Sequence, residues 1–215
     1  MSWSQARIRA PADDGVYPPP WVWEFPFRSD RLCLDFASTL GSRRSLKLER
    51  LHAPSDFKRW VRQAGLGELQ RVSKSGLARA VRLREAIHGL ATGEAQDQQA
   101  AIGSLNRAAV PSPLVAQLDA SGHESKWLPA ADVDQVLSTI ARDAIDLLSS
   151  PLRTRIRECA GADCTILFLD TSRPGTRRWC AMEVCGNQAK SAGLRAKREA
   201  DRATQTPRPA KQASA

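Results

Sequence analysis

The sequence has no apolar run long enough to cross a membrane or to form a secretory signal, and it opens with the polar stretch MSWSQARIRAPADDG. We therefore expect a cytoplasmic protein with no membrane partner. Histidine is scarce, because His52, His88 and His123 stand far apart, and the catalytic motifs HExxH, GxSxG, GxxxxGK[ST] and GxGxxG are absent. We expect no enzyme, although an active site assembled from residues distant in sequence would leave no such motif.

Charge is unevenly distributed along the chain. The net charge is +9, and residues 151–215 hold 13 Lys and Arg against 6 Asp and Glu, whereas residues 1–150 hold 19 against 17. The basic excess lies at the C-terminal end, where we expect a polyanion such as nucleic acid to bind. An anionic membrane surface is the competing interpretation, but this segment lacks the broad apolar face that interfacial anchoring needs.

Four of the five cysteines form two matched pairs. Four residues separate Cys159 from Cys164, fifteen follow, and four again separate Cys180 from Cys185. Two such pairs of thiolates can close a tetrahedral shell around one Zn²⁺, with no open position for catalysis. Disulfides would need an oxidising compartment, free buried thiols do not suit the polar turns around these cysteines, and an iron–sulfur cluster would use the same ligands. We predict one structural zinc ion.

The residues around the cysteines predict a small module of strands and one helix. Residues 152–158 (LRTRIRE) alternate in polarity and predict a strand, residues 165–169 (TILFL) predict a second strand, and residues 170–176 (DTSRPGT) predict a turn. A helix is predicted over residues 189–202, with Asn187 as its cap. The expected order is strand, metal turn, strand, loop, metal turn, helix.

One face of the predicted terminal helix is basic. Helical spacing brings together Ser191, Arg195, Arg198 and Arg202. Leu194 is the only large apolar residue in this segment, so the helix has little to bury and needs the zinc module or a polyanion as a partner. The alternative is a solvated helix with ordinary surface charge.

Four stretches resemble the CGNR-type zinc finger, which follows an ABATE domain in a family of bacterial stress-induced transcription regulators. They are C-x4-C at 159–164, LFLDTSR at 167–173, RRWCAMEVC at 177–185 and GNQAK at 186–190, and LDFASTL at 34–40 is similar to the start of the ABATE domain. The chain departs from the family pattern at Gln188, which replaces an arginine but can still pair with an adenine edge. The resemblance implies a regulatory or sensory N-terminal domain with a ligand pocket.

The sequence predicts an α+β protein with a mainly helical N-terminal domain over residues 21–150. A mobile arm is expected over residues 1–20, the zinc module over 151–202 and a disordered tail over 203–215. Predicted helices cover residues 56–64, 73 or 75 to 90, 95–109 and 131–149, with Ser55 as the first N-cap, and a β-hairpin covers 114–118 and 125–128. We expect Cys33 to be a buried hydrophobe and Asp35 to pair with Arg43 or Arg44.

The favoured function is a DNA-binding transcription regulator in which one Zn²⁺ holds the terminal module. The candidate phosphate contacts are Arg177, Arg178, Lys190, Arg195 and Arg198, and the candidates for base edges are Asn187 and Gln188. RNA is an alternative target, and a module that binds an acidic protein, or an enzyme with its site in the N-terminal domain, are alternative functions. We expect loss of zinc to unfold the module and leave the larger domain folded. The sequence specifies neither an oligomeric state nor an effector.

Overall fold

A computed structural model describes residues 24–128 and 131–204 of the chain. It is α+β, with long helices and three two-stranded antiparallel pairs, which confirms the predicted fold class. The predicted arm over residues 1–20 and residues 205–215 of the predicted tail lie outside the described residues. No helix among the described residues has the length and apolar character that a membrane crossing requires.

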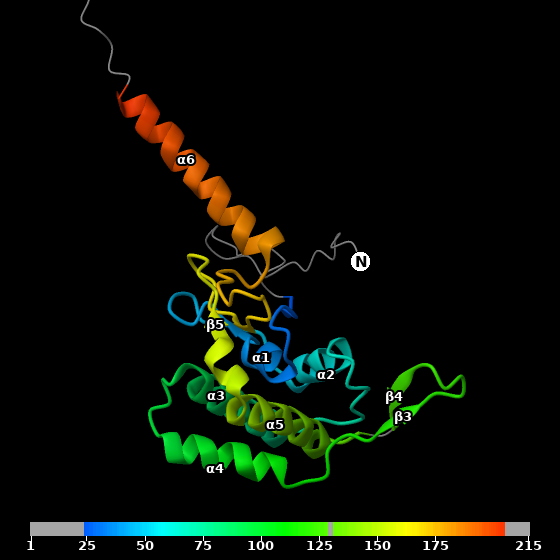
Figure 1. Ribbon diagram of the computed structural model, residues 1–215. Coiled ribbons are helices and arrows are strands. Elements are labelled where there is room, and N and C mark those ends of the chain that lie inside the picture. Colours follow the sequence, from blue (N-terminus) through cyan, green and yellow to red (C-terminus); the bar gives the residue numbers. More distant parts are fainter. Residues whose placement is uncertain (1–23, 129–130, 205–215) are drawn as a thin grey trace, which may run out of the picture.

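The helical domain comprises the described residues up to Ser149. Three long helices pack together at one end of the molecule, and α1 and α2 lie between them and the C-terminal module (Figure 1). The helices are α1 (Leu32–Ala37), α2 (Pro54–Gln63), α3 (Lys74–Thr92), α4 (Gln98–Ala109) and α5 (Val133–Ser149). The strand pairs are β1 (Leu40–Gly41) with β2 (Leu48–Glu49) and β3 (Ala116–Leu118) with β4 (Ser125–Trp127).

The ends of the long helices follow from local hydrogen bonding. The Ser73 hydroxyl accepts a hydrogen bond from the amide of Gly76 at the start of α3, and Asp97 and Asp132 cap α4 and α5 in the same way. α3 ends at Gly93, whose φ of 76° lies in the left-handed region that glycine adopts without strain. Free N–H groups and carbonyls at these ends are therefore satisfied locally.

The start of α2 differs from the prediction. Ser55 lies inside the helix, and the N-cap is Ala53, which has no side-chain oxygen. Pro54 occupies the first helical position, and the carboxylate of Asp56 reaches back to accept the Ala53 amide at 2.9 Å. Proline at this position loses no helical hydrogen bond, so the helix begins one residue before the serine that looks like its cap.

An aromatic cluster fills the centre of the helical domain. The rings of Phe36 and Trp60 have centroids 4.9 Å apart, Phe57 stacks on Trp60 at 6.4 Å, and all three side chains are fully buried. Truncating one such ring in a core of this kind costs about 3 to 5 kcal/mol. Cys33 packs in the same core at 1% exposure, as predicted for a buried hydrophobe.

Asp35 has a different partner from the one predicted. Its Oδ1 accepts hydrogen bonds from the backbone amides of Arg28 and Ser29 at 2.9 and 3.0 Å, and neither Arg43 nor Arg44 reaches it. Burial raises the pKa of Asp35 to about 6, because desolvation of the carboxylate outweighs these hydrogen bonds. The carboxylate thus shapes the loop before α1 at an electrostatic cost.

The C-terminal module begins at Pro151. A 3-10 helix, η2 (Pro151–Arg155), leads into β5 (Ile156–Glu158), which pairs with β6 (Leu167–Leu169). The predicted first strand is therefore wrong over residues 152–155, where Pro151 starts a helical turn and the Ser150 hydroxyl accepts the Leu152 amide. A π-helical turn, η3 (Met182–Gly186), precedes α6 (Asn187–Thr204), which projects away from the body (Figure 1).

β6 connects the module to the helical domain. All three of its side chains are buried, and because strand side chains alternate between faces, they enter two different cores. Leu167 and Leu169 pack in the core of the helical domain, whereas Phe168 packs with Cys159, Cys180 and other residues of the module. The module is therefore built onto the helical domain through a shared strand.

Candidate metal centre and nucleic-acid interface

Two turns bring the four paired cysteines together. Cys159 and Cys164 flank the turn between β5 and β6, and Cys180 and Cys185 flank the segment that leads into α6. Their four sulfur atoms all lie within 4.8 Å of one another. The spacing of the cysteines in the sequence thus corresponds to one cluster in space.

The cluster has the dimensions of a tetrahedral thiolate site. The sulfur of Cys180 lies 3.8 Å from that of Cys164 and 3.7 Å from that of Cys185. A tetrahedron with metal–sulfur bonds of about 2.3 Å has edges of about 3.8 Å, so the cysteines would fit Zn²⁺. A disulfide needs sulfur atoms about 2 Å apart, which excludes one between these residues.

The backbone around the cluster supports negatively charged sulfur. The amide of Cys180 donates to the sulfur of Cys159 at 3.3 Å, a hydrogen bond that favours the thiolate form of Cys159. Gly161 lies so close that an added Cβ would meet the sulfur of Cys185 at 3.3 Å and the Cβ of Cys164 at 3.0 Å. A side chain at Gly161 would push the two cysteine pairs apart.

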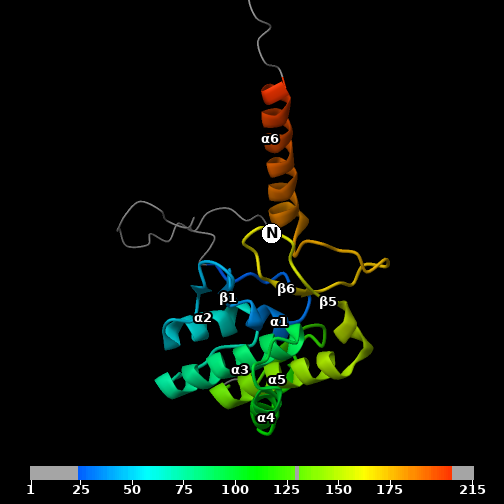
Figure 2. The same ribbon diagram turned by 90° about the vertical axis from the view of Figure 1, so that its left-hand side faces the viewer.

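The surface of α6 carries the basic face expected from the sequence. Residues 187–202 are all exposed, and the helix is about 27 Å long at 1.5 Å per residue. At about 100° per residue, Arg195, Arg198 and Arg202 lie within an arc of about 60°, with Asn187 and Gln188 on its two borders. Figure 2 shows the helix directed away from the rest of the chain. Lys190 lies more than 100° from the centre of that arc.

Comparison with protein-family models gives two adjacent matches. Residues 30–151 match the ABATE family, described as "Putative stress-induced transcription regulator", and residues 155–198 match the CGNR zinc finger. The first match covers more than half of the chain. The chain belongs to the ABATE family. No curated protein sequence matches it. The family resemblance predicted from the sequence is confirmed, and the cysteine cluster lies inside the matched zinc finger.

Arg177 of the CGNR finger stabilises the fold through contacts within the protein. Its guanidinium donates to Asp30 of the ABATE domain at 2.6 Å and to the carbonyl oxygens of Trp179 and Cys180. It also lies over the ring of Phe168, 4.6 Å from the centroid. The sequence predicts a phosphate contact for Arg177, whereas all three of its guanidinium nitrogens donate a hydrogen bond inside the protein.

Arg178 has the opposite environment. Its side chain is exposed, and its guanidinium lies 5.0 Å from the centroid of the half-buried Trp179. Trp179 packs against the core of the CGNR finger, which fits the expectation that it is a core residue. The two neighbouring arginines thus face different surroundings, and Arg178 has donors available for a ligand.

The ABATE domain and the CGNR finger are joined by polar contacts on both sides of β6. The amide of Leu169 donates to the Ser29 carbonyl at 2.9 Å, next to the Asp30–Arg177 ion pair. On the other side, Arg44 pairs with both oxygens of Glu158 at 2.6 and 2.8 Å. The first metal turn is therefore held in place by the ABATE domain.

Two acidic residues of this region, Asp30 and Asp170, hold functional loops in place without being predicted from the sequence. Asp170 is fully buried and accepts hydrogen bonds from the amides of Ser172 and Arg177 and from the Ser172 hydroxyl, and the hydroxyl contact lowers its pKa. Its sequence context, an aspartate two residues before a serine in a proline- and glycine-containing turn, is a signal that could have identified it. Asp30 has no such signal, because its partner Arg177 is 147 residues away.

Proposed function

We propose that this member of the ABATE family is a DNA-binding transcription regulator that holds one structural Zn²⁺ and acts in the bacterial cytoplasm. The observation that carries the proposal is the projecting α6, exposed over residues 187–202, with its arginine face, attached to the cysteine cluster of the CGNR finger. We further propose that the ABATE domain senses a small ligand and does not catalyse a reaction.

The distances among the four sulfur atoms support zinc as the bound metal. Cys159, Cys164, Cys180 and Cys185 would hold the ion with four thiolates, which leaves no site for substrate or water. When bound, the metal supplies folding free energy to a segment whose own core is small. The chain fixes the start of α6 directly after Cys185, so the metal site sets the direction of the helix.

The proposed DNA-binding face consists of exposed residues before and at the start of α6 and along its arginine side, together with Lys190 on a neighbouring side of the helix. Its phosphate contacts are Arg178, Lys190, Arg195 and Arg198, with Asn187 and Gln188 toward the bases. Arg177 no longer belongs to this set, because its guanidinium is used in three contacts within the protein. Four phosphate contacts predict a log–log salt slope of roughly −4.

The test is a titration of random-sequence duplex DNA onto the zinc-loaded protein at several salt concentrations, followed by fluorescence anisotropy. The double variant Arg195→Ala with Arg198→Ala should flatten the slope by about 2 and keep its zinc. A matched control is Arg62→Ala with Arg71→Ala, which removes the same charge from exposed positions of the ABATE domain. The control should retain the wild-type slope.

Two outcomes would overturn the DNA assignment. If the α6 variant and the control lose affinity equally, only net charge matters and α6 is not the binding face. If the zinc-loaded protein binds no duplex at low salt, the basic surface serves another partner, and an acidic protein becomes the leading candidate. Tighter binding to duplex RNA than to DNA would change the target but not the surface.

A further inference from the structure

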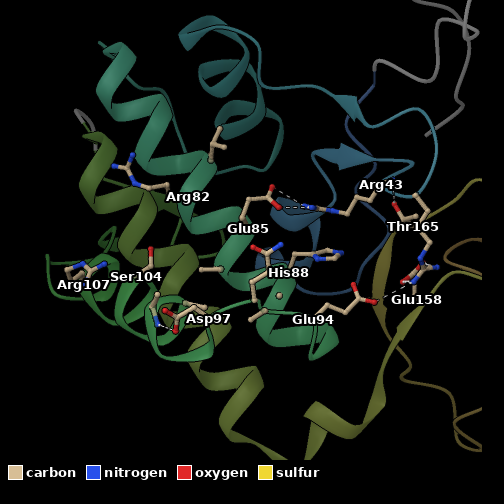
Figure 3. Close-up of a pocket in the computed structure, with 18 residues that line it drawn as sticks. Arg43, Arg82, Glu85, His88, Glu94, Asp97, Ser104, Arg107, Glu158 and Thr165 are labelled. Carbon is tan, nitrogen blue, oxygen red and sulfur yellow. Dashed lines mark hydrogen bonds and ion pairs between the residues drawn. The ribbon is translucent and has the colours of Figure 1, made fainter.

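A groove of about 760 Å³ lies between the ABATE domain and the CGNR finger (Figure 3). Its walls come from α3, from α4 and the loop before it, and from the turn at Arg43 and Arg44. Two residues of the finger, Glu158 and Thr165, complete the wall. A volume of this size is typical of small-molecule sites.

Part of the groove is fixed by contacts within the protein. Arg43 donates to Glu85 at 2.7 Å, and its backbone amide donates to the Thr165 hydroxyl at 3.1 Å. Arg44 forms the bidentate ion pair with Glu158. Glu94 lines the same end, 3.9 Å from Arg44, so two arginines face three carboxylates there. This end of the groove therefore disfavours the acidic group of a ligand, which must bind at the other end.

Other side chains of the groove have unused hydrogen-bonding groups. Within the described part of the chain, the side chains of Arg82, His88, Ser104 and Arg107 form no hydrogen bond or ion pair. Burial, with a smaller effect from the Arg43 charge, lowers the pKa of His88 to about 4, so its ring is neutral at pH 7 and offers one donor and one acceptor.

The unused groups are separated by type along the groove. Arg82 from α3 and Arg107 from α4 lie at one end, with Ser104 near them, while His88 lies toward the finger (Figure 3). Asp97 is also near the arginine end, but its carboxylate caps α4 by accepting the Ala100 amide at 2.9 Å. That end has two cations against one anion, which favours an acidic group.

Small residues leave room between the two ends. Five of the lining residues are alanine or glycine: Ala86, Gly89, Ala95, Ala100 and Ala101. At Gly89 even an added Cβ would meet Ala95 at 3.0 Å, so the loop before α4 is packed closely onto α3. The groove therefore has closely packed walls. It has room for the apolar part of an organic ligand between the arginine end and His88.

We propose that this groove binds a small organic anion, with its acidic group held by Arg82 and Arg107 and a hydrogen-bonding group beside His88. This assignment rests on the proposed regulator function and names the class of its effector. Glu158 and Thr165 directly adjoin the metal-binding residues Cys159 and Cys164. An occupant of the groove would therefore brace the first metal turn against the ABATE domain and slow zinc loss.

The experiment uses the full-length, zinc-loaded protein with three probes: adenosine monophosphate, benzoate and inorganic phosphate. Binding is followed by calorimetry, and zinc release to a chromogenic chelator is timed with and without each probe. We expect at least one organic probe to bind and to slow zinc release. Arg82→Ala with Arg107→Ala should weaken it about tenfold or more, because both arginines are exposed and their loss leaves the fold intact.

Two further variants separate the groove from other basic surfaces. His88→Ala should weaken the organic probe and leave phosphate binding unchanged, whereas Arg195→Ala with Arg198→Ala should retain the affinity of all three probes. If the α6 variant loses the probes, they bind the DNA face and the groove assignment is wrong. Absence of binding by every probe would also overturn it, and salt-sensitive DNA binding would then show that the regulator function stands without it.

Discussion

The ABATE domain and the CGNR finger bury their residues in different ways. The ABATE domain has a continuous apolar core centred on Phe36, Phe57 and Trp60. Among the described residues, the separate core of the finger has two buried side chains, Ile166 and Phe168, besides three of the clustered cysteines, with Trp179 and Val184 half-buried against them. A core this small cannot offset the conformational entropy of the segment, so we expect the finger to depend on a bound metal ion and on its packing against the ABATE domain.

The strand β6 shows how that dependence is organised. Leu167 and Leu169 belong to the core of the ABATE domain, and Phe168 between them belongs to the finger. Each leucine contributes about 1.5 to 3 kcal/mol to the stability of the ABATE domain by burial. Because one strand contributes to both cores, we expect the folding of the cysteine cluster and of the helical domain to be coupled.

Replacing one of the four clustered cysteines should have the largest effect on the stability of both domains. Cys180→Ser is expected to lose zinc, which contributes about 10 kcal/mol or more to small zinc modules, and to unfold the finger. Because Leu167 and Leu169 would leave their core, the ABATE domain should also melt at a lower temperature. Metal analysis measures the loss of zinc. Thermal unfolding, followed by a spectroscopic signal of the aromatic residues in the ABATE domain, measures the change in melting temperature.

Removing zinc from the wild-type protein with a chelator is the matching control, because it leaves the sequence unchanged. It should lower the melting temperature of the ABATE domain by the same amount as the substitution. If the finger unfolds in a separate transition and the ABATE domain melts as before, the domains are independent. That result would agree with the prediction from the sequence alone, in which loss of zinc leaves the larger domain folded.

Local signals in the sequence predicted most of the elements. The caps at Ser73 and in the Gly93 region, the hairpin near residues 116–127 and the order of strands and turns around the cysteines all depend on neighbours within a few residues. The cysteine cluster was predictable because its two pairs are symmetric and close in sequence. The errors at Ser55 and residues 152–155 both lie beside a proline, where the favoured first helical position competes with the side-chain pattern.

Contacts between distant residues were not predictable. The partner of Arg177 is 147 residues away, and the shared role of β6 requires knowledge of both cores. Arg177 and Arg178 look alike in the sequence, so both were assigned to the phosphate surface. The groove around His88 likewise forms only when α3, α4 and the finger come together.

The neighbouring residues Arg177 and Arg178 test the contact between the ABATE domain and the CGNR finger. Arg177→Met should lower the free energy of unfolding by about 2 to 4 kcal/mol, because Asp30 and the carbonyls of Trp179 and Cys180 lose a charged donor. Arg178→Met, at an exposed position, should change stability by less than about 0.5 kcal/mol and weaken DNA binding instead. Denaturant unfolding and DNA titration of both variants separate the two roles. Equal stability of the two variants would contradict them.

The smallest expected effect concerns Asp35, which shapes the loop whose Ser29 carbonyl accepts the amide of Leu169 in β6. Its folded-state pKa of about 6 lies above the ordinary value of 3.8, so the folded protein binds this proton more tightly than the unfolded chain. The contribution of Asp35 must therefore lower stability as pH rises from about 4 through the folded-state pKa to about 7, and remain constant above that range.

Asp35→Asn should remove this fall in stability. Because one oxygen, Oδ1, accepts both loop amides, the asparagine oxygen can keep these hydrogen bonds while the buried charge is lost. Denaturant unfolding across pH should show the variant gaining about 1 to 3 kcal/mol over wild type between pH 4 and 7. Zinc lost in acid affects both proteins and cancels in the difference. A variant that is less stable than wild type at pH 7 would mean that the negative charge of Asp35 stabilises the loop. The contact of this loop with β6 would then depend on an ionised carboxylate.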